Sequence, residues 1–187
     1  SQIQGGYALV MLTKNVLIGA RDIFGIRPLV IGTINNSYVL ASETCALDII
    51  GAEFIREVEN GEIVYIENDK LHSLKPFGNH KPRPCVFEYI YFARPDSILR
   101  GKTAYEYRKN LGRELAKEDN VDAELVVPVP DSGNAAAIGY SQQKKIDFDL
   151  GLIRNHYVGR TFIEPGQQIR SLGVKLKLNA NQSAIKN

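Results

Sequence analysis

Asp131, Ser132 and Gly133 lie in "VVPVPDSGNAAAIGY" (126–140), where an apolar run passes through a tight turn into a helical pattern. Ligands in open α/β sheets bind at the carboxyl ends of strands, and free N–H groups around Gly133 and Asn134 suit a phosphate or pyrophosphate. Asp131 and Ser132 add the hard oxygen atoms that Mg²⁺ prefers. The alternative is a strand–helix turn in which Asp131 or Ser132 only caps the helix.

A second stretch suited to anions is "RNHYVGRTFIEPGQQIR" (154–170), which contains Arg154, Arg160 and Arg170 but one acid, Glu164. The guanidinium group offers a fixed fork of donors that matches phosphate. Glycine and proline interrupt the stretch, as they do in loops that fold over a ligand and exclude water. A solvated surface loop is the alternative, but the nearby turn at 130–133 favours an anion-clamping loop.

The other residues that could carry chemistry favour structural roles. Arg21, Asp22 and Arg27 are predicted to fix a loop through charge pairs, and Ser42 is predicted to cap a short helix. Cys45 falls on the apolar face of that helix, which indicates core packing. The three histidines are too scattered to form a metal site.

Composition and charge narrow the class of protein. The net charge of +2 does not suggest a nucleic-acid binder, but residues 151–187 hold six basic residues and one acid, whereas residues 1–150 hold 17 and 20. An anion is therefore drawn to the C-terminal part. Two cysteines fit a reducing cytoplasm, and no apolar run is long enough to span a membrane. A start at Ser1, close to an apolar run, hints at a piece of something longer.

The elements that must position these residues change in kind along the chain. Residues 5–78 read as antiparallel strands around one short helix at 43–51, which Gly51 ends. The segment 76–84 is rich in proline and polar residues, so we place a domain boundary there, between residues 78 and 79. A helix (103–118), a buried strand (123–129), a turn and a second helix (134–143) then predict an α/β unit with a parallel sheet.

Six stretches that follow one another along the chain resemble consecutive motifs of a known family. They are "RDIFGIRPLVIG", "LASETCALDIIGAEFIREVENGEIVYI", "CVFEYIYFARPDS", "VPVPDSGNAAAIGY", "NHYVGRTFIEPGQQIR" and "VKLKLNAN". The family is that of the glutamine phosphoribosylpyrophosphate amidotransferases. Other glutamine amidotransferases share motifs like the first two, but not "FEYIYFARPDS" or "NHYVGRTF".

The resemblance implies a fold that combines α+β and α/β parts. Residues 1–78 would form the C-terminal part of an N-terminal-nucleophile glutaminase sandwich with antiparallel β-sheets. Residues 79–187 would form the N-terminal part of a type I phosphoribosyltransferase α/β domain, with its flexible loop. The implied reaction converts glutamine, phosphoribosylpyrophosphate and water to 5-phosphoribosylamine, glutamate and pyrophosphate, the first step of de novo purine biosynthesis. Family members are cytoplasmic homo-oligomers that use Mg²⁺ and are inhibited by purine nucleotides.

Residue by residue, the resemblance places Asp131, Ser132 and Gly133 near pyrophosphate, with Ser132 at a position associated with Mg²⁺. It makes residues 154–170 the loop that closes over phosphoribosylpyrophosphate, with Arg154, Tyr157 and Arg160 as catalytic candidates. Cys85 matches a [4Fe-4S] ligand in the cluster-bearing branch of the family. Cluster-free members also hold a cysteine there, so both interpretations of Cys85 stay open.

The 187 residues also depart from the family pattern. They lack the glutaminase nucleophile, the ribose-phosphate signature and three further cluster cysteines. We therefore expect an internal slice that performs neither half-reaction by itself. Two alternatives stay open: a stand-alone phosphoribosyltransferase fused to an unrelated β domain, and a non-catalytic phosphoribosylpyrophosphate-binding or regulatory module.

Overall fold

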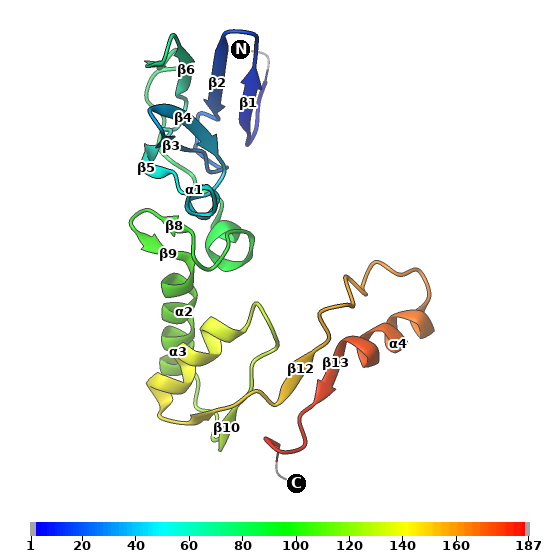
Figure 1. Cartoon of the computed structure of the whole chain (residues 1–187). Coiled ribbons are helices and arrows are strands. Elements are labelled where there is room, and N and C mark those ends of the chain that lie inside the picture. The colour runs from blue at the N-terminus through cyan, green and yellow to red at the C-terminus, as the bar shows by residue number, and fades with distance from the viewer. Residues whose placement is uncertain (1–2, 186–187) are drawn as a thin grey trace. The chain divides into compact units, whose positions relative to one another are not determined.

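The computed structural model describes residues 3–185 and separates into two compact units, residues 1–105 and 106–187 (Figure 1). This division lies beyond the predicted boundary at residues 78 and 79, because the intervening segment packs on the first unit. The N–H of Arg83 donates to the carbonyl of Phe24 at 2.8 Å, and the N–H of Cys85 donates to Ile26 at 3.2 Å. Whether residue 78 ends a functional domain stays a prediction.

The first unit holds two larger antiparallel sheets, as its apolar runs separated by turns predict. The first sheet has the order β1-β2-β6-β7 and the second the order β4-β3-β5, and every pairing in them is antiparallel. The first consists of β1 (Ala8–Leu12), β2 (Val16–Arg21), β6 (Ile63–Glu67) and β7 (Lys70–Leu74); the second of β3 (Val30–Ile34), β4 (Ser37–Ala41) and β5 (Glu53–Glu57).

Strand β3 contributes side chains to two apolar clusters because successive side chains on a strand point to opposite faces. Ile31 packs with Val64 of β6 in the cluster that joins the two sheets. Val30 faces the other way and packs with Leu47 of the helix α1 (Thr44–Ile50). Gly32 lies on the same side as Val30, where an added Cβ would come within 2.8 Å of a Leu47 methyl carbon. The unit is therefore layered as sheet, sheet and helix.

Helix α1 ends as predicted and begins differently. Gly51 stands at its C-cap with φ of 69°, a conformation that favours glycine. The predicted Ser42 cap is wrong, because Glu43 occupies the N-cap position and gives no side-chain cap. The Glu43 carboxylate instead accepts hydrogen bonds from Ser97 Oγ (2.7 Å) and the N–H of Arg94 (2.8 Å). This fixes a later segment of the unit to the start of the helix.

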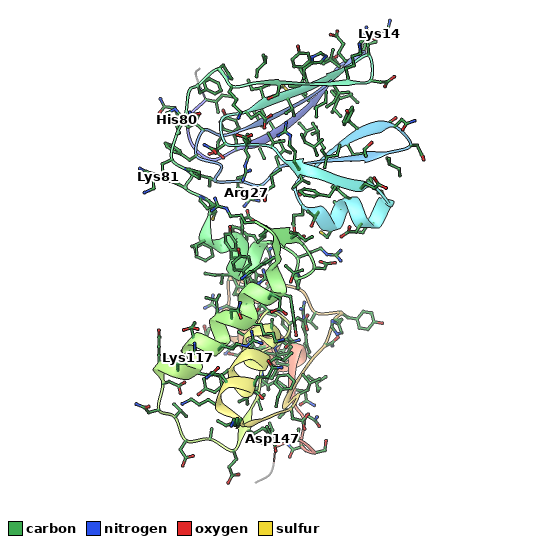
Figure 2. The ribbon with its side chains drawn as sticks, turned by 90° about the vertical axis from the view of Figure 1, so that its left-hand side faces the viewer. Lys14, Arg27, His80, Lys81, Lys117 and Asp147 are labelled. Carbon is green, nitrogen blue, oxygen red and sulfur yellow. The ribbon has the colours of Figure 1, made fainter. Side chains whose placement is uncertain are left out.

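That later segment contains elements that the sequence did not predict. Residues Glu88–Phe92 form one turn of π-helix, η1, and a short hairpin follows from β8 (Ile98–Leu99) and β9 (Lys102–Thr103). The buried Glu88 carboxylate pairs with Arg27, which is labelled in Figure 2. Burial raises the pKa of Glu88, and the Arg27 charge opposes that rise.

A buried carboxylate, Glu62, connects the two sheets. It accepts both arms of the Arg56 guanidinium from β5 at 2.7 and 2.8 Å, and Ser73 Oγ of β7 at 2.6 Å. The N–H of Glu59 adds a fourth hydrogen bond at 2.6 Å. Burial alone would raise the pKa of Glu62, but these hydrogen bonds together lower it from 4.5 to about 2.

The second unit begins within α2 (Ala104–Glu118) and has the α/β character that the sequence predicts. The predicted second helix is present as α3 (Asn134–Lys144). The strand predicted to be buried is reduced to β10 (Leu125–Val126), which is only half-buried and pairs in parallel with β11 (Asp147–Phe148). The unit ends with β12 (Leu152–Arg154), α4 (Gln167–Lys177) and β13 (Leu178–Ala180), and β12 and β13 pair antiparallel.

Helices α2 and α3 approach each other closely through two glycines. A Cβ on Gly112 of α2 would lie 1.8 Å from the Ala136 carbonyl oxygen, and one on Gly139 of α3 would lie 1.9 Å from the Lys109 carbonyl oxygen. Both obstacles are backbone atoms, which cannot move aside as a side chain can. The two helices therefore pack backbone to backbone.

We expect Gly139→Ala to lower the free energy of unfolding of the second unit by about 2–3 kcal/mol, because the added methyl group forces the helices apart. The measurement is chemical denaturation. Gly159→Ala is the matched control, since nothing lies within 4 Å of a Cβ built there. Equal denaturation midpoints for the two variants would contradict the close crossing.

The pKa of Glu62 gives the first unit a pH-dependent stability. Since the folded-state pKa is about 2 against an ordinary 4.5, the ionised carboxylate stabilises the fold above pH 4.5 and this contribution is lost as the pH falls towards 2. We expect Glu62→Gln to cost on the order of 3 kcal/mol at neutral pH and to flatten the acid dependence of stability. Glu67→Gln on the exposed end of β6 should leave both unchanged, and denaturation across this pH window measures them.

Candidate functional site

The turn before α3 satisfies two of its own N–H groups. Gly133 donates its N–H to the Val129 carbonyl at 3.1 Å, and Asn134 donates to the Asp131 carbonyl at 3.2 Å. The prediction that these two groups are free for an anion is therefore wrong for the structure as it stands. The capping alternative is wrong as well, because Gly133 is the N-cap residue and no side chain caps α3.

The structure brings the turn and the cationic segment together through one ion pair. A carboxylate oxygen of Asp131 contacts Nη1 of Arg154, the last residue of β12. The Asp131 side chain is 51% exposed and that of Arg154 is 30% exposed. Two residues that the sequence proposed separately, 23 positions apart, therefore meet in one place. Ser132, between Asp131 and Gly133, is exposed.

Unpartnered polar atoms concentrate at this place. Within residues 3–185, three buried side-chain polar atoms have no hydrogen-bond partner, and two of them are Asn134 Oδ1 and Arg154 Nε. Leaving such a group unpaired costs about 1–3 kcal/mol. The first residue of α3 thus carries one unused acceptor, and the last residue of β12 carries one unused donor. The sequence signal for Asn134 was its place just after the turn.

The loop within the cationic segment is shorter than predicted, because both ends of the segment belong to regular elements. Its first residue, Arg154, belongs to β12, and its last four residues open α4. The N–H of Asn155 donates to the Lys177 carbonyl at 2.8 Å, which extends the β12–β13 pairing and confines the loop to residues 155–166. The sequence did not predict the helix at 167–170, because the proline and glycine at 165–166 are typical of a loop.

The three arginines of the segment have different surroundings. Arg154 is held by Asp131, whereas Arg170 donates to the Glu164 carbonyl at 3.1 Å and to Gln167 Oε1 at 2.7 Å. Arg160 is exposed and makes no ion pair within the described part of the chain. Tyr157 is fully exposed. Within residues 3–185, the Arg160 charge has no acidic partner and the Tyr157 side chain stands in solvent.

The first unit contributes residues with structural tasks, as predicted. Arg21 donates to the Arg27 carbonyl at 2.7 Å and to the Val58 carbonyl at 2.6 Å. The fully buried Asp22 accepts the N–H groups of Phe24 (3.0 Å) and Ile26 (2.9 Å). Cys45 is buried, as core packing requires.

Ser132 and Cys85 are the residues that the sequence proposed as metal ligands. A [4Fe-4S] cluster takes four cysteines, and the sequence holds Cys45 and Cys85. Among residues 3–185, no three His, Cys, Asp or Glu side chains gather as metal ligands. Mg²⁺ is commonly held by one or two carboxylates together with substrate phosphates, and the half-exposed Asp131 suits that arrangement.

Comparison with known proteins places the chain among homologues of one kind. No protein-family model matches it. It is 56% identical over 189 residues to the amidophosphoribosyltransferase of Rhizobium etli, 46% over 184 residues to that of Mycobacterium tuberculosis and 53% over 178 residues to that of Synechocystis. These alignments cover 98%, 98% and 94% of this chain, and 38%, 35% and 36% of the relatives.

Solved structures agree. The glutamine phosphoribosylpyrophosphate amidotransferase of Bacillus subtilis, complexed with ADP and GMP, matches with a TM-score of 0.89 at 46% identity, over 98% of this chain and 40% of that one. A second structure, described as the allosteric regulatory enzyme of purine biosynthesis, gives a TM-score of 0.87 at 46% identity, over 97% and 39%.

Together these findings define a mixed α/β protein with antiparallel sheets. Nearly the whole chain is homologous to part of the amidophosphoribosyltransferases. The resemblance seen in the sequence is confirmed. The chain spans about two fifths or less of the length of the relatives that it matches. In the described residues, no helix is both long and apolar enough to cross a membrane.

Because the Tyr157 side chain is fully exposed, we expect Tyr157→Ala to leave the denaturation midpoint unchanged. Tyr140→Phe is the contrasting variant in the same unit. Its hydroxyl donates to the Asp119 carboxylate at 2.8 Å, and that hydrogen bond raises the pKa of Tyr140, so its loss should lower the midpoint. A clear destabilisation by Tyr157→Ala would show that Tyr157 has a structural role.

Proposed function

We propose that this chain is part of an amidophosphoribosyltransferase. The reaction takes glutamine, phosphoribosylpyrophosphate and water to 5-phosphoribosylamine, glutamate and pyrophosphate, the first step of purine biosynthesis. The observation that carries the proposal is the 46–56% identity over 94% or more of the chain to proteins of that name. Fold likeness to two purine-biosynthesis enzymes supports it.

The change from antiparallel sheets to α/β elements along the chain suggests how the work is divided. The antiparallel sheets at residues 1–78 support assignment to a glutaminase sandwich, which releases ammonia from glutamine. The α/β elements after residue 79 support assignment to a type I phosphoribosyltransferase domain, which uses that ammonia. In the transfer step the bond between C1 of the ribose and pyrophosphate breaks, and a bond from C1 to the ammonia nitrogen forms.

In that domain we assign pyrophosphate binding to the place where Asp131 and Arg154 meet. Negative charge grows on pyrophosphate as it leaves, so Arg154 and Arg160 would stabilise the transition state by charge-assisted hydrogen bonds. Exposed Tyr157 would move with the loop at 155–166 and help to exclude water from the reacting ribose. Ser132 and Gly133 would line the same turn.

The metal requirements are part of the proposal. Asp131 and Ser132 would hold Mg²⁺ together with phosphate oxygens, and the bound ion would supply positive charge to the leaving group. Cys85 could supply one ligand of a [4Fe-4S] cluster only beside cysteines outside these 187 residues, so we derive no step from it.

For the whole protein, we propose a cytoplasmic homo-oligomer. Purine nucleotides are proposed as inhibitors, because the similar Bacillus subtilis enzyme was solved in complex with ADP and GMP.

The test is glutamine-dependent release of pyrophosphate from phosphoribosylpyrophosphate by the full-length gene product. We expect Arg160→Gln to raise the KM for phosphoribosylpyrophosphate about 10- to 100-fold, since it removes a charged donor to phosphate. Lys117→Gln is the control, because Lys117 is an exposed cation of the same unit whose pair with Glu114 is a surface pair (Figure 2). A full-length protein that releases no pyrophosphate would refute the proposal.

A further inference from the structure

The first unit holds a cavity with a volume of about 490 Å³, which we call the aromatic pocket. The rings of Tyr7, Phe24, Phe77 and His80 line it, together with the aliphatic side chain of Ile23. Small-molecule sites have volumes in this range and the same kind of lining, mostly apolar and aromatic with a few polar groups. Because apolar surface in contact with water is unfavourable, such a lining favours a ligand with an apolar face.

Hydrogen bonds fix the backbone behind the walls of the aromatic pocket. The buried carboxylate of Asp22 accepts the N–H of Phe24 at 3.0 Å. The side-chain amide of Asn60 donates to the Ile23 carbonyl at 3.2 Å and to the His80 carbonyl at 2.9 Å. Asn60 thereby joins the loop after β2 to the segment after β7. Since the two segments are already held, a ligand does not have to order them when it binds.

The rings of the aromatic pocket are oriented by one another and by the backbone. Phe24 and His80 meet edge to face, with their ring centroids 6.0 Å apart and their planes at 76°. The Phe77 carbonyl accepts a hydrogen bond from His80 Nε2 at 2.9 Å. Aromatic rings gain further stabilisation from offset-stacked or edge-to-face contact with another ring, and an aliphatic chain does not. The walls therefore favour a planar aromatic ligand.

The border of the aromatic pocket is cationic. Residues 75–83 include three lysine or arginine residues and no acidic residue. Lys75 is paired with an acid of the turn before β6, but within residues 3–185 no ion pair holds the exposed Lys81 or Arg83. The guanidinium carbon of Arg83 lies 5.3 Å from the centroid of the Phe24 ring, so its charge stands beside a wall of the cavity. Among the described residues that line the pocket, none is acidic, and the local field favours an anion.

We infer that the aromatic pocket binds a small planar aromatic molecule that carries a negative charge. Its ring packs among Phe24, Phe77 and His80, and its anionic group lies towards Lys81 and Arg83. An apolar side chain from another segment of the full-length protein would satisfy the rings but leave both cations without a partner. The inference does not rest on the proposed reaction, because it concerns a cavity of the first unit alone.

The test is equilibrium dialysis of the full-length gene product against 2-naphthoate and, separately, its neutral amide, 2-naphthamide. The two probes share the same rings and differ in charge. We expect the carboxylate to bind about fivefold or more tightly than the amide, because the amide gains nothing from the two cations. Phe77→Ala should weaken both probes about three- to tenfold, since it removes one aromatic wall and keeps the backbone carbonyl that holds His80.

The charge of the border is tested in the double variant of Lys81→Gln and Arg83→Gln. We expect it to reduce the preference for the carboxylate to about twofold or less. The matched control is the double variant of Lys14→Gln and Lys70→Gln, which removes the same charge from exposed hairpin residues of the same unit. Figure 2 shows Lys14 far from His80 and Lys81, so this control should keep the full preference. All four substituted side chains are exposed, and the denaturation midpoints should stay unchanged.

Three results would overturn the inference. Absence of 2-naphthoate binding up to its solubility limit would mean that another segment of the full-length protein covers the pocket. Undiminished binding to the Phe77→Ala variant would place the probe at a different site. Equal affinities of the unmodified protein for the carboxylate and the amide would exclude the anionic class of ligand. None of these results bears on the proposed reaction, which glutamine-dependent release of pyrophosphate decides.

Discussion

The carboxylate of Glu62 is the interaction on which the layered unit depends. Burying a carboxylate is costly, and the cost is met only where several donors converge in good geometry. Here the donors come from β5, from β7 and from the N–H of Glu59 in the turn before β6, so the two sheets must be correctly placed for all of them to meet. Because a shift of β5 or β7 would leave a buried charge unpaired, Glu62 opposes alternative pairings more strongly than apolar packing alone could.

Asp22 is a second buried carboxylate that converging donors hold in place, here in a loop. Its buried carboxylate gathers N–H groups from Tyr7, Phe24, Ile26 and Arg27, and thereby fixes the path of the chain between β2 and β3. Arg27, at the end of that path, pairs with Glu88 of the π-helical turn. Hydrogen-bonded and paired charges thus connect the sheets, the loop between β2 and β3, and the π-helical segment that follows the sheets.

The second unit is stabilised differently, and the difference suits its proposed task. Its helices meet at glycines through backbone contact, and α4 has no buried residue. Tyr157 and Phe162 of the loop are largely exposed, so few apolar contacts resist its displacement. We propose that the close helix crossing keeps the turn at 130–133 in place while residues 155–166 open and close.

How far the sequence predicts the structure depends on how local each interaction is. Apolar runs bounded by turns, Gly51 and the turn before α3 are local signals, and the strands of the first unit, the end of α1 and the start of α3 follow from them. The prediction of a Ser42 cap was wrong because Glu43 begins the helix and its carboxylate accepts a hydrogen bond from Ser97, 54 positions away in the sequence. The prediction of free N–H groups at Gly133 and Asn134 was wrong. Whether the N–H groups of a turn find acceptors within it depends on its dihedral angles and not on its composition. The pairing of Asp131 with Arg154 joins two sequence candidates whose meeting only the fold decides.

That meeting also explains how three arginines can stand so close together before a ligand arrives. Like charges on one short segment repel, and each needs a compensating oxygen. Arg170 finds neutral oxygens on Glu164 and Gln167, and Arg154 finds the carboxylate of Asp131. Arg160 alone keeps its charge exposed to solvent among these three. Of the three arginines, the segment therefore presents one uncompensated cation, Arg160, to solvent, while protein oxygen atoms hold Arg154 and Arg170.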